Sequence, residues 1–149
     1  TMLGYYKNEE ATRAVLDADG WYHTGDLGTM SADGHVFIRG RIKNMLLGSN
    51  GQNVYPEEIE DKLNSMAYVN ESLIVQKGDK LIGLVHPDYD EAKAMDFNDD
   101  DLMSIMEQNR LKLNEQLPPF CKISELRLHE DEFVKTPKKS IKRYLYKDV

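Results

Sequence analysis

Residues 40–60 read GRIKNMLLGSNGQNVYPEEIE, and this stretch combines a strand break, a hairpin signal and a helix start. Within it, residues 44–56 contain an apolar run, a Gly/Asn-rich turn and a short return, which together predict a β-hairpin. Pro56 and the two acidic residues after it predict a helix, because proline fits the first turn and acidic side chains suit the positive end of the helix dipole. We therefore expect a domain boundary within residues 40–44, followed by a self-contained α+β unit.

The chain after this stretch alternates between strand and helix signals. Two short apolar runs, residues 72–76 and 80–86, flank a Lys-Gly-Asp turn and predict a second hairpin. Asn98 or Asp99 can cap a helix that runs to about Gln116. Residues 122–128 predict a further strand, and the basic segment after it leads into a last short helix. The fold class we expect is α+β, with hairpins and a small sheet packed with helices.

The chain before this stretch is expected to be rich in strand and turn. Residues 9–17 have helical spacing, and DADGW at 17–21 predicts a turn. DGHVFIRGR at 33–41 predicts a turn and a strand that Gly40 and Arg41 break. The first residue is not methionine, and we expect the chain to be the C-terminal piece of a longer polypeptide.

Composition places the chain among globular proteins and argues against general nucleic-acid binding. Of its 149 residues 40% are hydrophobic and 30% charged, and the net charge of −7 opposes phosphate contact over a wide surface. The charge is uneven, since residues 88–101 are acidic and residues 135–143, KTPKKSIKR, are basic. The basic segment indicates either local contact with phosphate or carboxylate, or a solvated tail. One cysteine, Cys121, permits no internal disulfide and favours a reducing compartment.

Four motifs in order carry a family resemblance: residues 4–28 (GYYKNEEATRAVLDADGWYHTGDLG), 33–41, 48–60 and 135–143. The chain resembles the C-terminal part of the adenylate-forming enzymes, which include acyl-CoA synthetases, peptide-synthetase adenylation domains and luciferases. Residues 40–60 are most similar to the long-chain fatty-acid–CoA ligases. The resemblance implies that residues 1–40 end a large AMP-binding domain, that 41–44 form a hinge and that 45–149 form a mobile C-terminal domain.

The resemblance also implies roles for three polar residues. Asp26, in HTGDLG at 23–28, could on residue type alone shape a turn or bind a ligand, and in the family this aspartate accepts hydrogen bonds from the ribose hydroxyls of ATP and of the acyl-adenylate. Arg41 matches an arginine that contacts ribose and phosphate, although a plain surface arginine is the alternative. Lys43 matches the hinge residue, or is an ordinary linker lysine.

The glycine-bearing turn of residues 48–51 has an implied role in binding CoA. Gly48, Ser49, Asn50 and Gly51 match a turn that lines the pantetheine tunnel, and small residues there let a thin ligand pass close to the backbone. A hairpin turn is the simpler alternative, and both can hold. Tyr55, Glu58 and Glu60 are expected to be helix-entry and surface residues.

The basic segment departs from the family pattern at the position of the catalytic lysine. In the family a lysine, usually after a glycine or another small or apolar residue, contacts the carboxylate substrate and the α-phosphate during adenylation. Matching Thr136 and Ile141 without a gap puts Ser140 at that position. Lys139 could substitute for the missing lysine, or Lys142 could, or adenylation could be slowed.

The resemblance finally implies substrates and partners. The expected reaction joins a fatty acid to CoA with ATP and Mg²⁺, and most ligand contacts are expected in a missing N-terminal domain, so that this chain alone is inactive. The alternatives are another adenylating enzyme, for a carrier protein or a different acid, and a non-catalytic binding module. The four histidines and Cys121 lack ligand spacing, so no metal site is assigned. We expect a cytoplasmic protein with at most peripheral membrane contact.

Overall fold

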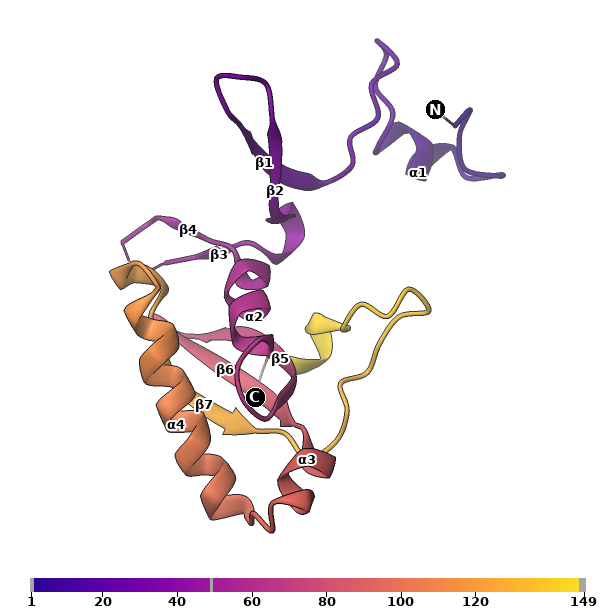
Figure 1. Ribbon diagram of the computed structural model, residues 1–149. Coiled ribbons are helices and arrows are strands. Elements are labelled where there is room, and N and C mark those ends of the chain that lie inside the picture. The colour runs from indigo at the N-terminus through magenta and orange to yellow at the C-terminus, as the bar shows by residue number, and fades with distance from the viewer. Residues whose placement is uncertain (1, 49, 148–149) are drawn as a thin grey trace. The chain divides into compact units, whose positions relative to one another are not determined.

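The computed structural model describes residues 2–48 and 50–147, and the chain divides into two compact units between Lys43 and Asn44. Each unit is described separately below (Figure 1). The first unit contains helix α1 (Glu9–Arg13), strands β1 (Asp26–Met30) and β2 (Val36–Arg41), and most of the 3-10 helix η1 (Ile42–Asn44). Ser49, one of the predicted CoA-binding residues, lies outside the described residues.

In the first unit β1 and β2 form an antiparallel hairpin that differs from the expected single strand. The predicted break at Gly40 and Arg41 is wrong, since β2 continues through both and pairs Gly40 with Leu27. The irregularity is instead a bulge in β2: Leu27 pairs with Gly40 and Gly28 with Ile38, so Arg39 is an extra residue of β2 at this point. The helix expected over residues 9–17 is shorter than predicted, and α1 ends at Arg13.

The second unit is built on a three-stranded sheet of β5 (Val69–Lys77), β6 (Lys80–Pro87) and β7 (Ile123–Leu128), in the order β5-β6-β7. β5 and β6 form the predicted antiparallel hairpin, whereas β6 and β7 are parallel. A parallel pair needs a long crossover connection, which α3 (Tyr89–Ala94) and α4 (Asp99–Glu115) supply. The remaining elements are the hairpin β3 (Leu46–Leu47) and β4 (Asn53–Val54), helix α2 (Pro56–Asn64) and the 3-10 helices η2 (Pro119–Cys121) and η3 (Arg143–Tyr146).

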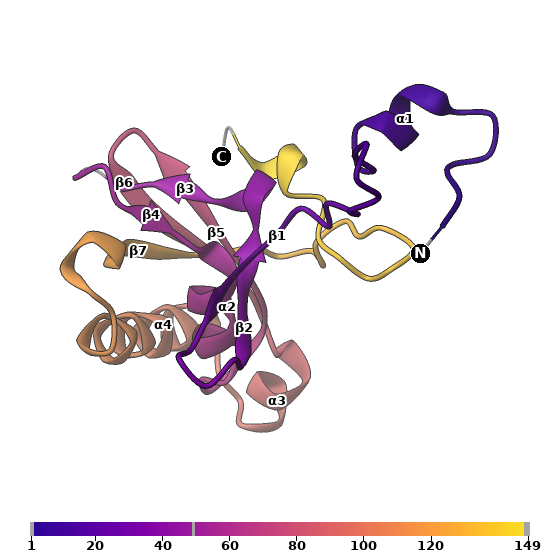
Figure 2. The same ribbon diagram turned by 90° about the horizontal axis from the view of Figure 1, so that it is seen from above.

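The two faces of this sheet are covered by different parts of the chain. Helices α2 and α4 pack on one face, where Leu63 and Leu113 are fully buried against Ile74, Val85 and Ile123. The opposite face carries Leu73, Val75, Ile82 and Leu84, which contact Phe133, Ile141 and Tyr146 of the C-terminal segment. Figure 2 shows α4 on one side of the sheet and the yellow C-terminal segment on the other. The alternation of side chains along each strand therefore gives two hydrophobic clusters.

The predicted α+β class is confirmed, and so are the two hairpins of the second unit, α2, α4 and β7. The sequence did not predict α3, which is six residues long and lies in the acid-rich stretch. Two acids of that stretch take part in helix caps: Asp88 accepts from the N–H of Glu91 at α3, and Asp101 forms a capping box with Asn98 at α4. Within the described residues, no helix is both long and apolar enough to cross a membrane.

The packing of α2 on the sheet predicts a large effect of truncating Leu63. We expect Leu63→Ala to lower the free energy of unfolding by about 2 to 5 kcal/mol, because the cavity it leaves in the core can relax only in part. Leu111→Ala, the same change at a half-exposed position of α4, should cost less than about 1 kcal/mol. Urea unfolding of both variants measures the difference, and equal losses would mean that α2 does not pack as described.

Candidate functional site

Asp26 and Arg41 lie directly opposite each other across the β1–β2 hairpin. The register pairs the two residues, and Nη1 of Arg41 donates to Oδ1 of Asp26 over 2.7 Å and to the carbonyl oxygen of Thr24 over 2.6 Å. The side chains are 37% and 57% exposed, so the pair faces solvent and can meet a ligand. Both bonds use the same nitrogen of the guanidinium, and only the bond to Asp26 uses a carboxylate oxygen. An arginine fork and a carboxylate have further donors and acceptors for a ligand that carries hydroxyl and phosphate groups.

The bend that aims Asp26 depends on the two residues before it. Gly25 has a φ of +75°, a left-handed conformation that glycine adopts without steric cost. The hydroxyl of Thr24 accepts from the backbone N–H of Asp26 over 3.1 Å, which closes the turn. Asp26 therefore ends the turn and begins strand β1. The turn is closed by its backbone N–H and the carboxylate is partly exposed, so shaping the turn and binding a ligand are compatible roles.

The loop before this bend is held by Asp17, a residue that the sequence analysis placed only in a turn. Its carboxylate accepts from the backbone N–H groups of Trp21 and Asp19 and pairs with the ring of His23. The N–H of Trp21, followed by the His23 ring, lowers the pKa of Asp17 below its usual value. A sequence signal for this loop was present, since an Asp side chain in a turn typically accepts from the backbone N–H two residues on, as Asp17 does from Asp19.

The glycine-bearing turn joins β3 to β4 as a tight hairpin. Gly48 donates to the carbonyl oxygen of Gln52 and accepts from the N–H of Gly51, while Oδ1 of Asn50 accepts from the N–H of Gln52. Gly51 has a φ of +78°, and this left-handed conformation favours glycine there. The hairpin prediction for this turn is confirmed, and its role in binding CoA stays a prediction.

The basic segment forms a closed turn with an unusual backbone. The N–H of Lys139 donates to the carbonyl oxygen of Thr136 over 2.8 Å, and Pro137 follows Thr136, the position in a β-turn at which proline is favoured. The backbone N–H of Thr136 in turn donates to the carbonyl oxygen of Ser140, and Lys135 pairs with Ile141. We call residues 136–140 the basic turn. Pro137, Lys138, Lys139 and Ser140 are exposed in it.

Lys139 has a φ of +61°, in the region that favours glycine. It directly precedes Ser140, which the sequence analysis matches to the catalytic lysine, and that resemblance implies a glycine or another small or apolar residue at position 139. The structure thus keeps a left-handed backbone at this point without a glycine. Such a conformation costs a non-glycine residue about 1 to 2 kcal/mol, which the surrounding hydrogen bonds offset.

The two ends of the basic turn are held by ion pairs to buried or partly buried carboxylates. Lys135 pairs with Glu71 of β5, and Arg143 pairs with Glu60 of α2. Glu60 was expected to be a surface residue, and this is wrong, because only 7% of it is exposed. Burial raises the pKa of the Glu60 carboxyl, and the Arg143 guanidinium acts in the opposite direction. The sequence signal that could have found this pair is weak, because the two residues are 83 positions apart.

Lys43 and Lys142 lie at element ends. Lys43 is in η1, at the division between the two compact units, and Lys142 precedes η3 and is half-buried. The described structure does not test the hinge role of Lys43 or a catalytic role of either lysine. Asp26 and Arg41 belong to the first unit, whereas the glycine-bearing turn and the basic turn belong to the second.

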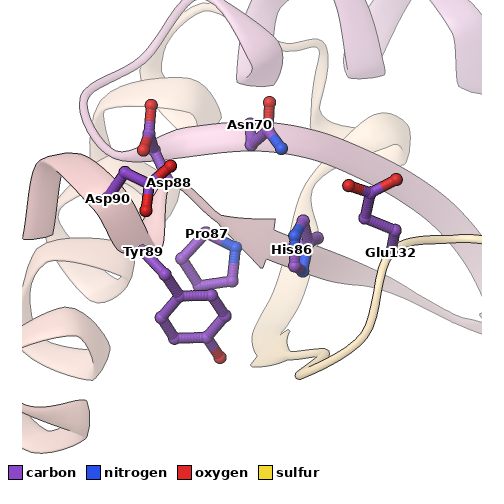
Figure 3. A pocket seen from close by; sticks show the side chains of 7 residues that line it. All are labelled: Asn70, His86, Pro87, Asp88, Tyr89, Asp90 and Glu132. Atoms are coloured by element: carbon purple, nitrogen blue, oxygen red, sulfur yellow. The ribbon is translucent and has the colours of Figure 1, made fainter.

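A separate pocket of about 330 Å³ lies at the end of β6 and the start of α3, and it contains no predicted site residue (Figure 3). Seven residues line it: Asn70, His86, Pro87, Asp88, Tyr89, Asp90 and Glu132. Asp88 already caps α3, and the ring of His86 contacts that of Tyr89 edge-on. Among the described residues, no three His, Cys, Asp or Glu side chains are grouped to hold a metal ion. Cys121 is buried, which raises the pKa of its thiol and disfavours the reactive thiolate.

The fold of the second unit is that of the small domain of adenylate-forming enzymes, and comparison with known proteins identifies the family. The model of the AMP-binding enzyme C-terminal domain matches residues 43–148. The chain therefore belongs to the AMP-binding enzyme C-terminal domain family.

Similar proteins include several enzymes that activate acids. A 3-[(3aS,4S,7aS)-7a-methyl-1,5-dioxo-octahydro-1H-inden-4-yl]propanoyl:CoA ligase of Rhodococcus jostii is 40% identical over 108 residues, which cover 72% of this chain and 21% of the ligase. A long-chain-fatty-acid–CoA ligase of Gallus gallus, ACSBG2, is 40% identical over 80 residues, or 53% of this chain and 10% of the ligase. The adenylation domain of a carboxylate reductase from Mycobacterium chelonae has the same fold, with a TM-score of 0.85, 21% identity, and coverage of 98% of this chain and 24% of that one. The chain thus spans about a fifth or less of the length of these two ligases.

The left-handed backbone at Lys139 predicts that the basic turn tolerates glycine there but not a β-branched residue. We expect Lys139→Val to speed amide exchange at Ser140 and Lys142 about tenfold, because a β-branched side chain is strained at positive φ. Lys139→Gly should leave the exchange unchanged or slow it. Lys138→Val is the matched control, since the φ of Lys138 is not positive. Hydrogen exchange followed by NMR measures all three, and similar exchange in the two valine variants would contradict a strained turn.

Proposed function

We propose that this chain is the C-terminal part of an AMP-forming long-chain fatty-acid–CoA ligase. In this proposal residues 1–40 end the large AMP-binding domain, residues 41–44 are the hinge and residues 45–149 are the mobile C-terminal domain. The parent enzyme would join a fatty acid to CoA and convert ATP to AMP and pyrophosphate. The chain alone would be inactive, because most contacts with ATP, the acid and CoA would lie in the preceding domain.

The observation that carries the proposal is the pairing of Asp26 with Arg41 on adjacent strands, with both side chains open to solvent. An ionised carboxylate accepts two ribose hydroxyls well, and a guanidinium beside it suits the ribose and the nearby phosphate. The family membership of residues 43–148 supports a nucleotide as the ligand. Several exposed apolar residues of the first unit, including Trp21, Val36 and Ile38, would be covered by the preceding domain.

The long-chain acid is supported by two observations of different kinds. Residues 40–60 resemble the long-chain ligases, and the Gallus gallus relative bears that name. Other matched proteins are named for other acids, as the Rhodococcus jostii ligase is. The identity of the acid is therefore the most specific element of the proposal. A ligase for another acid is the second candidate, and a panel of acids separates the two.

The proposed reaction has two steps, adenylation of the acid and transfer of the acyl group to CoA, and residues of this chain would act in both. A carboxylate oxygen of the acid attacks the α-phosphorus of ATP, and the bond to pyrophosphate breaks, which leaves an acyl-adenylate. Lys139 or Lys142 of the basic segment would counter the charge that gathers on the phosphate in this step. The C-terminal domain would then rotate about Lys43, and the glycine-bearing turn, Gly48 to Gly51, would line the path of CoA. The thiolate sulfur of CoA attacks the acyl carbon, and AMP leaves.

Mg²⁺ would accompany ATP in the parent enzyme, but the described residues offer it no set of ligands, so no step is assigned to it here. We place the parent enzyme in the cytoplasm. Its contact with membranes would be peripheral at most. A long-chain acid partitions into bilayers, and such a contact would bring the enzyme to its substrate.

The direct test is release of pyrophosphate from ATP by the full-length polypeptide with palmitate, with the 149-residue chain as control. The proposal expects release that depends on palmitate in the full-length protein, continues beyond one turnover only when CoA is present, and is absent from the chain alone. Octanoate, acetate and an octahydroindenyl propanoate complete the panel. Release with another acid but not with palmitate would overturn the long-chain assignment, and none with any acid would overturn the ligase.

Asp26→Asn in the full-length polypeptide tests the proposed ribose contact. The change keeps the size of the side chain but removes the charge, and hydrogen bonds to a charged group contribute about 1.5 to 3 kcal/mol. We therefore expect AMP to bind about 10- to 100-fold more weakly, as measured by calorimetry. Asp33→Asn is the matched control on the β1–β2 turn, where Asp33 bonds Ser31 and His35, and it should leave the affinity within twofold. Unchanged AMP binding in Asp26→Asn would mean that Asp26 only shapes its turn.

A further inference from the structure

We propose that Arg143 is the positioning residue of the basic turn, and that its ion pair with the buried Glu60 fixes where that turn presents its lysines. This inference rests on the proposed function. It adds a residue pair, Glu60 and Arg143, that would hold the basic turn in place during adenylation. Arg143 would act through Lys139 or Lys142 and not by touching the substrate itself.

Glu60 is a fixed anchor because three donors hold its buried carboxylate. Oε1 accepts from the backbone N–H of Ile74 over 2.7 Å and from Nη1 of Arg143 over 2.7 Å, and Oε2 accepts from Nη2 of Arg143. Ile74 belongs to β5, which is at the edge of the sheet, so its N–H is satisfied by a helix side chain. The carboxylate thus joins α2, the edge strand and the C-terminal segment at one point.

The bidentate geometry restricts the segment more than one contact would. A guanidinium that binds both oxygens of a carboxylate has its plane and direction set by the pair, whereas a lysine ammonium has no such constraint. Arg143 follows Lys142 directly, and the N–H of Lys142 donates to the carbonyl oxygen of Val134 over 2.8 Å on the other side of the turn. The backbone between Arg143 and the basic turn is therefore short and closed at its base.

The same guanidinium also lies near Glu57, which binds the last residue of the predicted hinge segment, Asn44. Oε1 of Glu57 accepts from the side-chain amide of Asn44 over 2.6 Å, and Nη2 of Arg143 lies 3.9 Å from the same oxygen. Asn44 follows Lys43, the predicted hinge residue. Arg143 thus links the start of the C-terminal unit to the basic turn through two carboxylates of α2. A rotation about the hinge would carry the turn along as part of one body.

Removing Arg143 would leave Glu57 and Glu60 close together without their cation, so the variants need a design that separates positioning from folding. Arg143→Met removes the pair, and Arg143→Lys keeps the charge but not the fork. The double variant Glu60→Gln with Arg143→Met removes the buried charge of Glu60 together with its cation and keeps an oxygen for the N–H of Ile74. Glu57, whose side chain is 28% exposed, then loses only a cation that lay 3.9 Å away. Arg127→Met is the matched control, since it removes an arginine that pairs with Glu125 on the same strand.

The first measurement is hydrogen exchange of the amides of Ser140 and Lys142 in the 149-residue chain. We expect exchange about tenfold faster in Arg143→Met and in the double variant, a smaller change in Arg143→Lys, and none in Arg127→Met. The urea midpoint of the double variant should stay near that of the unchanged chain. Unchanged exchange in the double variant would overturn the inference, because the turn would then be held without Arg143.

The second measurement separates the two half-reactions in the full-length polypeptide. Pyrophosphate release with palmitate should fall at least tenfold in kcat in Arg143→Met and in the double variant, with the KM for ATP within twofold. Formation of palmitoyl-CoA from synthetic palmitoyl-adenylate and CoA should stay within twofold, because the basic turn acts only in the first step. Equal losses in both half-reactions would show a merely structural role and overturn the inference.

The two arms also separate this inference from the proposed function. If the unchanged full-length polypeptide releases no pyrophosphate with any acid, the proposed function fails. The exchange experiment then still reports whether Arg143 fixes the basic turn, since it needs no substrate. If release occurs and the Arg143 variants retain it in full, the function stands and the positioning role fails.

Discussion

The carboxylate of Glu60 is the point on which the second unit depends. A carboxylate removed from water is costly unless it is paired and hydrogen-bonded, and here a backbone N–H of β5 and the guanidinium of Arg143 meet that requirement together. Because three separate parts of the chain must arrive at the same place to satisfy one side chain, the interaction specifies their arrangement as well as stabilising it. A hydrophobic residue at position 60 would fill the space but would hold neither the edge strand nor the basic segment.

The rest of the unit follows from the need to cover both faces of a three-stranded sheet. Helices α2 and α4 cover one face, and since the chain between β7 and η3 contains no long helix, the other face is covered by irregular chain through Phe133, Ile141 and Tyr146. The hydroxyl of Tyr146 accepts from the N–H of Val134, and this hydrogen bond joins the two ends of the segment that covers the sheet. The basic turn projects from a segment whose two flanks are part of the core, so it can be exposed and still well placed.

Sequence patterns predicted the elements that have long periodic signals and missed what depends on distant partners. The capped helix α4 and the hairpins were predictable because caps and turns are local. The short helix α3 was missed because its acidic residues resembled a solvated stretch. The strand was expected to end at Gly40 because a glycine usually interrupts pairing, but a bulge at Arg39 of the same strand lets the pairing continue, and that bulge depends on the register with β1. Asp26 and Arg41 were each assigned to the ribose through the family resemblance, and the register shows that they pair directly across the hairpin.

The serine at position 140, where the family resemblance implies a lysine, follows a residue with an unusual backbone conformation. Residue 139 has the left-handed conformation that favours a glycine, yet it is a lysine. The chain therefore holds a left-handed turn at some cost in strain. If Ser140 matches the catalytic lysine, as we propose, the nearest preceding positive charge lies one residue earlier than the resemblance implies. A shift of one residue in a tight turn changes the direction of the side chain, and the four-carbon stem of a lysine can compensate for part of that change. Compensation works only if the base of the turn does not move, which makes the anchoring of Arg143 more important here than it would be with a lysine at position 140.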